Sequence, residues 1–213
     1  MLASLIVPAM MVQAVALAGP STLSMSLSTT ESVYGQSVTA TATLTTVPGP
    51  AQGDVVFSVD GLAIRADLAA SGTATAVLPA APVGQHAVSA TFVPQFPDAQ
   101  PASTSLAQAW VVAQARTRLQ VRVTGKGARI PTSVRVKAAG EYGTRPTGRV
   151  RIVVRRTGTR DATRVASRLS ATALMRAELG TLRKGRYRLV VNYAGDSQHL
   201  REVRVETFSV RRR

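Results

Sequence analysis

The side chains able to do acid–base or nucleophilic chemistry are few in this chain of 213 residues, and they are widely spaced. It has two histidines, His86 and His199, and no cysteine. A thiolate nucleophile, a cysteine-ligated zinc and a disulfide are therefore excluded. Asp54, Asp60 and Asp67 lack the spacing of a calcium loop. We predict no catalytic residue, no metal ligand and no cofactor, and we expect the chain not to be an enzyme.

Short motifs of known chemistry are also missing. There is no Gly-x-Ser-x-Gly elbow, and Gly125–Gly127 lacks the spacing of a phosphate-binding loop. His86 occupies the position that Tyr187 takes in a repeated strand described below, so we interpret it as a strand side chain. The Gly195-Asp196 dipeptide is interpreted first as a turn. No small-molecule substrate is expected.

Basic side chains are the remaining candidates for function, and their distribution is uneven. Residues 1–115 hold one basic and five acidic residues, a net charge of −4, whereas residues 116–213 hold 25 basic and six acidic residues, a net charge of +19. Such an asymmetry favours a polyanionic partner for the second half. The cations expected to point outward from strands, and so to contact a polyanion, are Arg118, Arg122, Arg135, Lys137, Arg149, Arg151, Arg155, Arg186 and Arg188.

Two other interpretations of this charge remain open. In a sandwich the first four of these cations lie on one sheet and the last five on the other, so the charge surrounds the domain. Such a surface attracts cell-wall polymers, acidic glycans or DNA without a dedicated groove. In addition, 23 of the 26 basic residues are arginine. A GC-rich genome also encodes arginine on exposed strand faces without any binding role.

The clearest strand pattern in the sequence runs from Tyr187 to Tyr193. Apolar and polar residues alternate along it with a period of two, which is typical of a half-buried strand. Val191 is therefore predicted to lie in a core, with Asn192 in solvent. Gly185 and Gly195 bound the strand as turn residues.

The same pattern occurs once upstream. Residues 84–94 align with residues 185–195 at an offset of 101, which places Phe92 on Tyr193. The same offset relates Ala74 to Met175. The chain therefore reads as two copies of one β unit of roughly 95 residues.

Alternating apolar residues and turn signals predict about seven short strands in each unit. In the first unit the expected strands cover residues 23–27, 38–44, 53–59, 63–66, 72–78 and 84–94, with a last strand that ends at 112. In the second unit they cover residues 119–123, 134–138, 150–154, 175–179, 187–193 and 203–210. In the last strand, Val203 and Val205 share one parity while Phe208 and Val210 share the other. This switch predicts a β-bulge near 206–207.

Many short strands with frequent turns are typical of an immunoglobulin-like sandwich, here without its cysteines. The predicted fold class is all-β, with two tandem immunoglobulin-like β-sandwiches after an N-terminal signal-like segment. We place the domains at residues 19–113 and 116–210, followed by a basic tail at 211–213.

The N-terminal segment, Leu2 to Ala18, is apolar and ends in a small-x-small pattern. That pattern predicts cleavage by a signal peptidase before Gly19, although no Lys or Arg precedes Arg65. A membrane anchor is the alternative, but 17 residues that include Pro8 are short for a span. Either way, the protein is expected to be extracellular or in the cell envelope.

Several short motifs resemble the bacterial Ig-like repeat domains of secreted and cell-surface proteins. They are Val33-Tyr34-Gly35-Gln36-Ser37-Val38, Gly53-Asp54-Val55-Val56-Phe57, Gly72-Thr73-Ala74-Thr75-Ala76, Pro82-Val83-Gly84 and Tyr193-Ala194-Gly195-Asp196. The resemblance covers residues 22–112 well and 117–210 less well, because the second unit lacks a Tyr-Gly before its second strand. It implies a fold without a chemistry.

From this resemblance we expect a non-catalytic spacer or adhesion module of the bacterial envelope, usually in tandem. Its partners would be other repeats of the same protein, other surface proteins, or cell-wall and extracellular anionic polymers. The alternative is a polyanion-binding module that acts through the arginine-rich second domain.

Overall fold

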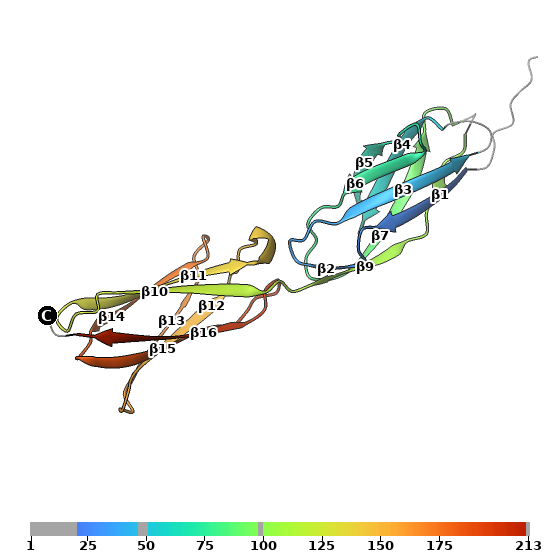
Figure 1. Ribbon diagram of the computed structural model, residues 1–213. Helices are drawn as coiled ribbons and strands as arrows, with labels where there is room; N and C mark the ends of the chain where they lie inside the picture. Colours follow the sequence, from blue (N-terminus) through green and yellow to red (C-terminus); the bar gives the residue numbers. More distant parts are fainter. Residues whose placement is uncertain (1–20, 47–50, 98–99, 212–213) are drawn as a thin grey trace, which may run out of the picture. The chain divides into compact units, whose positions relative to one another are not determined.

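The computed structural model describes residues 21–46, 51–97 and 100–211, and within them the chain is built from β-strands and one short 3₁₀ helix, Glu141–Gly143 (Figure 1). The all-β prediction is confirmed. The signal-like segment and its predicted cleavage site lie outside the described residues. No helix of the described part is long and apolar enough to cross a membrane.

Strands β1 to β9 occupy the first half of the chain. They are β1 (Ser21–Leu27), β2 (Glu31–Val33), β3 (Thr39–Thr46), β4 (Gly53–Val59), β5 (Leu62–Asp67), β6 (Thr73–Val77), β7 (Gly84–Pro94), β8 (Ser103–Thr104) and β9 (Gln108–Ala113). One sheet has the order β1-β3-β6 and the other the order β2-β9-β7-β4-β5, with β8 paired to β7. We call these two sheets the first sandwich.

Strands β10 to β16 form the second sandwich in the same manner. They are β10 (Thr117–Thr124), β11 (Pro131–Gly140), β12 (Arg149–Arg156), β13 (Ala162–Arg168), β14 (Leu174–Thr181), β15 (Gly185–Tyr193) and β16 (Glu202–Val210). A three-stranded sheet has the order β10-β11-β14, and a four-stranded sheet has the order β13-β12-β15-β16. Each of the four sheets contains strands from only one half of the chain.

Each sandwich buries one face of its strands, with a period of two. On β7 every second residue from His86 to Phe92 is buried, and on β15 every second residue from Tyr187 to Tyr193. Val191 is fully buried and Asn192 is exposed, as the alternation predicts. The second core joins residues of both its sheets and consists mainly of Val, Leu, Ile and Ala, which suit short strands.

Equivalent turns precede β6 and β14. Gly72 has φ +77° and Ala173, 101 residues later, has φ +56°. In both turns this residue donates its N–H three residues back, to the carbonyl of Ala69 or of Ser170, at 2.9 Å. The second sandwich therefore holds an alanine in left-handed backbone where the first has the glycine that this conformation favours.

The prediction of a β-bulge in the last strand is wrong. The register of β15 with β16 runs without a shift from Gly185↔Val210 to Tyr193↔Glu202, so there is no bulge at 206–207. Because the ladder is regular, Val203 and Val205 lie on the outer face and are 50% and 44% exposed. Arg211, the first residue of the predicted basic tail, forms a bridge with Gly127.

The sequence pattern also missed three strands, β2, β8 and β13. The short β2 pairs in parallel with β9, and Glu31–Val33 was too short to show any period. β13 pairs antiparallel with β12 at the edge of its sheet. Its side chains are nearly all exposed, so apolar residues do not alternate along it.

Candidate functional site

The outer face of the four-stranded sheet carries all five cations that we predicted there. Arg149, Arg151 and Arg155 of β12 are exposed, as are Arg186 and Arg188 of β15. The structure adds Arg164 and Arg168 of β13, which pair with Val153 and Arg149 and so share this face. Sequence reasoning missed these two because it did not predict β13.

The outer face of the three-stranded sheet carries the other four predicted cations. Arg118 and Arg122 lie on β10, and Arg135 and Lys137 on β11, all exposed. β14 adds Arg176, directly opposite Arg135. The expectation that the two sets lie on different sheets is confirmed, and Arg176 is a further member that the alternation of β14 could have revealed.

The register places several arginines directly opposite one another. Arg155 pairs with Arg188 and Arg149 with Arg168 on the four-stranded sheet. On the three-stranded sheet Arg135 lies between Arg122 and Arg176. Residues directly opposite in an antiparallel pair have Cβ atoms about 5 Å apart, and like charges there destabilise the sheet. This arrangement costs stability unless anions offset it.

The two faces differ at their centres. On the four-stranded sheet the middle row is Arg164, Val153, Val190 and Val205, so its three valines separate the arginine pairs. The three-stranded sheet has a continuous row of arginines at its centre instead. Ion pairs compensate little: Arg176 meets Glu178 at 2.9 Å, but both side chains are more than half exposed. Such exposed pairs contribute about 1 kcal/mol or less.

A second polar feature is the cluster that Asp196 and Thr144 form around the buried His199. His199 is 2% exposed; its Nδ1 lies 2.9 Å from Asp196 Oδ1 and its Nε2 3.0 Å from Thr144 Oγ1. Asp196 also accepts hydrogen bonds from the backbone N–H and hydroxyl of Thr147, at 2.7 and 2.8 Å, and from the N–H of Gln198. The cluster ties the loop before β12 to the loop after β15.

Electrostatics of the cluster favour a charged Asp196. Burial alone would raise the pKa of Asp196, but the hydrogen bonds from Thr147, Gln198 and His199 outweigh it and hold the pKa below its usual range. Burial, and then the nearby Asp196 charge, raise the pKa of the Tyr193 hydroxyl. The carboxylate therefore acts as a hydrogen-bond acceptor for these loops.

The order Asp196, His199, Thr144 resembles a catalytic triad, but its geometry does not serve nucleophilic attack. Thr144 Oγ1 donates to the Glu141 carbonyl at 2.7 Å, so its proton is not directed toward His199. The histidine is also buried. Sequence reasoning treated Asp196 as a turn residue and did not connect it with His199, three positions on; the Asp-x-x-His spacing was the available signal. No group of three or more metal-ligating side chains occurs among the described residues.

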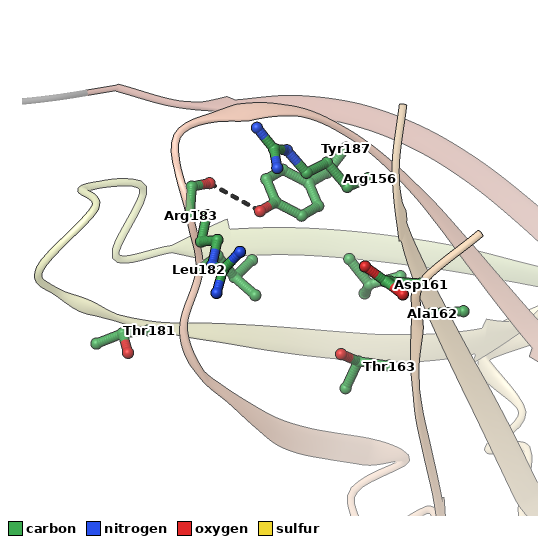
Figure 2. A pocket seen from close by; sticks show the side chains of 9 residues that line it. Arg156, Asp161, Ala162, Thr163, Thr181, Leu182, Arg183 and Tyr187 are labelled. Atoms are coloured by element: carbon green, nitrogen blue, oxygen red, sulfur yellow. Dashed lines mark hydrogen bonds between the residues drawn. The ribbon is translucent and has the colours of Figure 1, made fainter. Parts of the chain in front are cut away.

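A hollow of about 340 Å³ lies where β12 and β14 end and β13 begins (Figure 2). It is lined by Val154, Arg156, Asp161, Ala162, Thr163, Thr181, Leu182, Arg183 and Tyr187. Two of its polar groups hold the loop before β15: Arg156 Nη2 donates to the Lys184 carbonyl and Tyr187 Oη to the Arg183 carbonyl, at 2.8 and 2.7 Å. None of the nine predicted polyanion contacts lines this hollow.

Comparison with known proteins bears mainly on the first sandwich. Residues 25–113 match the family described as "Bacterial Ig-like domain (group 3)". This agrees with the resemblance found in the sequence motifs of that half. A search of curated protein sequences finds no match.

Solved structures give distant likenesses. The fibronectin(III)-like modules of Clostridium thermocellum CbhA are 15% identical, with 88% of this chain and 94% of that chain covered and a TM-score of 0.33. The adhesin InvE of Yersinia pseudotuberculosis is 17% identical over 87% of this chain and 58% of its own, with a TM-score of 0.38. The D0-D1 domain of intimin is 17% identical over 89% and 97%, with a TM-score of 0.31. All three TM-scores fall below 0.5, so the fold rests on the sheets described above.

Proposed function

We propose that this chain, whose residues 25–113 are a bacterial Ig-like domain, is a non-catalytic spacer or adhesion module of the bacterial cell surface. The family match carries the proposal. The motifs that carry the family resemblance are turns and core positions and identify no chemistry, so the passive role is proposed by analogy with the family.

The roles of the two histidines support a non-catalytic function. His86 Nε2 lies 2.8 Å from the Pro82 carbonyl, in the turn that precedes its own strand. His199 is held between Asp196 and Thr144. Both side chains are buried, and both join a loop to the sandwich.

Replacement of the module in its native host tests the spacer role. The chain would be exchanged for an unrelated β-sandwich pair of similar length, and cell adhesion would be measured with and without the exchange. A spacer predicts unchanged adhesion, whereas lost adhesion assigns a specific contact to this module. Protease digestion of intact cells should cleave the protein, and full protection would contradict a surface location.

A second candidate function, polyanion binding, is favoured by one observation: arginines lie directly opposite one another on both faces of the second sandwich. An anionic polymer would relieve this repulsion. Attraction of this kind depends on counterion release, so affinity should fall steeply with salt. Titration of the full chain against an array of anionic polymers at two salt concentrations tests it; no binding at low salt would leave the arginines as a solvated surface.

A further inference from the structure

The outer face of the three-stranded sheet concentrates its charge along one line. Arg122 of β10, Arg135 of β11 and Arg176 of β14 are in register across the three neighbouring strands. Strands in a sheet lie about 4.8 Å apart, so the Cα atoms of the outer two arginines are separated by about 10 Å. We call these three residues the arginine row.

Neighbouring rows strengthen the positive charge of this face. Lys137 lies one row away, between Gln120 and Leu174, and Arg118 lies one row further. On the other side Thr124 and Ser133 share a hydrogen bond of 2.8 Å between their hydroxyls. The residues that the register assigns to this face thus include five cations and one acid, Glu178.

Only one member of the row has a carboxylate partner. Within residues 100–211 the structure places an ion pair on Arg176 but on neither Arg122 nor Arg135. Arg135 has an arginine on each side, which is the least favourable position in the sheet for a cation. An external oxyanion at this position would offset the repulsion on both sides at once.

Shallow hollows lie over this row. One, of about 230 Å³, is lined by Arg122, Arg135 and Lys137 among others; a second, of about 240 Å³, is lined by all three residues of the row with Thr124 and Ser133. Arg122 and Arg135 therefore form a wall shared by two depressions, which suits a ligand that runs along the face.

We propose that the arginine row is a binding site for consecutive oxyanions, phosphate or carboxylate, of a linear anionic polymer of the cell envelope. The proposal rests on the second candidate function above and names its site. Guanidinium groups offer paired N–H donors that match both oxyanions. None of the residues that the register places on this face is aromatic, so bases or sugar rings find no stacking platform. The polymer is recognised through its charge.

The other face provides a matched control. Arg149, Arg155 and Arg188 are also exposed strand arginines of the same sandwich, and each has an arginine directly opposite. There a row of valines interrupts the charge, so no three arginines are in line across the strands. The control variant replaces these three residues with threonine and lowers the net charge by the same amount as a triple variant of the row.

The experiment compares the full wild-type chain with Arg122→Thr/Arg135→Thr/Arg176→Thr and with the control variant. Threonine keeps strand propensity, and circular dichroism checks the fold of each variant. The probes are inorganic polyphosphate, which supplies phosphate, and polygalacturonate, which supplies carboxylate. Affinity for each is measured across a salt series.

Loss of three contacts should weaken binding to a flexible chain on the order of 100-fold at about 0.1 M salt and lower the salt slope by about 2. The control variant should lose less than about tenfold. The probe that binds the wild type more tightly identifies which oxyanion the site takes.

Equal losses in both variants would overturn the site while leaving diffuse polyanion binding intact. Binding that neither variant weakens would also overturn it. If the wild type binds neither probe at low salt, the polyanion-binding function itself fails.

Discussion

The two sandwiches share a scaffold and differ in what it displays. β7 and β15 both begin at a glycine with positive φ, Gly84 at +154° and Gly185 at +157°, and both bury every second side chain. Yet residues 1–115 carry −4 and residues 116–213 carry +19. Because only the buried parity is fixed by the core, the exposed parity is free to vary. Fold and surface chemistry are therefore separable in this chain.

The last strands of the two sandwiches also differ. β9 is covered along its edge by the parallel strand β2. β16 is the edge strand of its sheet, and Arg211, which follows it, forms a single bridge with Gly127. Uncovered edges invite pairing with other chains, and charged side chains are one protection against it. Arg204 and Glu206, joined at 2.8 Å on β16, fit that role.

The largest expected effect is the destabilisation of the second core without the first. Val191→Asp places a charge at a fully buried position and should cost about 4 kcal/mol or more of the free energy of unfolding. Trp110, the only tryptophan, is buried in the first sandwich. Circular dichroism should therefore show early unfolding of the second sandwich, while tryptophan fluorescence keeps its wild-type transition.

Asn192→Asp is the control, since that side chain is exposed, and should change stability by about 0.5 kcal/mol or less. Ala90→Asp, at the equivalent buried position of β7, should instead shift the fluorescence transition. Equal losses at positions 191 and 192 would contradict the register.

The next effect tests the cluster of Asp196, His199 and Thr144 in the second sandwich. Asp196→Asn should cost about 2 kcal/mol at neutral pH, because hydrogen bonds to a charged acceptor are lost. The folded pKa of Asp196 lies below the unfolded value of about 3.9, so its contribution is present above that value and disappears as pH falls. Acid titration of stability should be flatter in the variant than in the wild type. The exposed Asp161→Asn is the control; a like effect there would point to net charge instead.

A smaller effect compares the equivalent turns. Gly72→Ala should destabilise the first sandwich by about 1–2 kcal/mol, because φ is +77° and a Cβ would lie 2.7 Å from the Leu44 carbonyl oxygen. Ala173→Gly should stabilise the second sandwich by about 0.5 kcal/mol, since relief of the left-handed alanine exceeds the added chain entropy. Chemical denaturation measures both. Changes of the same sign would mean that the turns are not equivalent.

The smallest expected effect concerns surface charge. Arg135→Thr should stabilise the second sandwich by about 0.5 kcal/mol at low salt and by less at high salt, because repulsion from its two arginine neighbours is removed. Arg65→Thr in the first sandwich should have the opposite sign, since Arg65 Nη1 meets Asp54 Oδ2 at 2.7 Å. Salt-dependent melting measures both, and a stabilising Arg65→Thr would sink this account of the two surfaces.

The sequence by itself determined which residues are buried and which are exposed in the regular strands, because a period of two assigns each residue to a face without knowledge of its partners. Val191, Asn192 and the nine outward cations followed from it. The pattern gave no signal for β13, whose edge position leaves few side chains to bury. The pattern gave a wrong prediction at Val203 and Val205, because these exposed valines alternate along the strand as core residues do.

Only the tertiary structure decided which residues meet across strands. Register depends on hydrogen bonds between segments far apart in the chain, and a shift of one residue would change every neighbour. The line of Arg122, Arg135 and Arg176 and the joining of Asp196, His199 and Thr144 both arise in this way. Sequence spacing placed Arg122 and Arg135 on strands and Asp196 in a turn; pairing between strands and loops brought these residues to their partners.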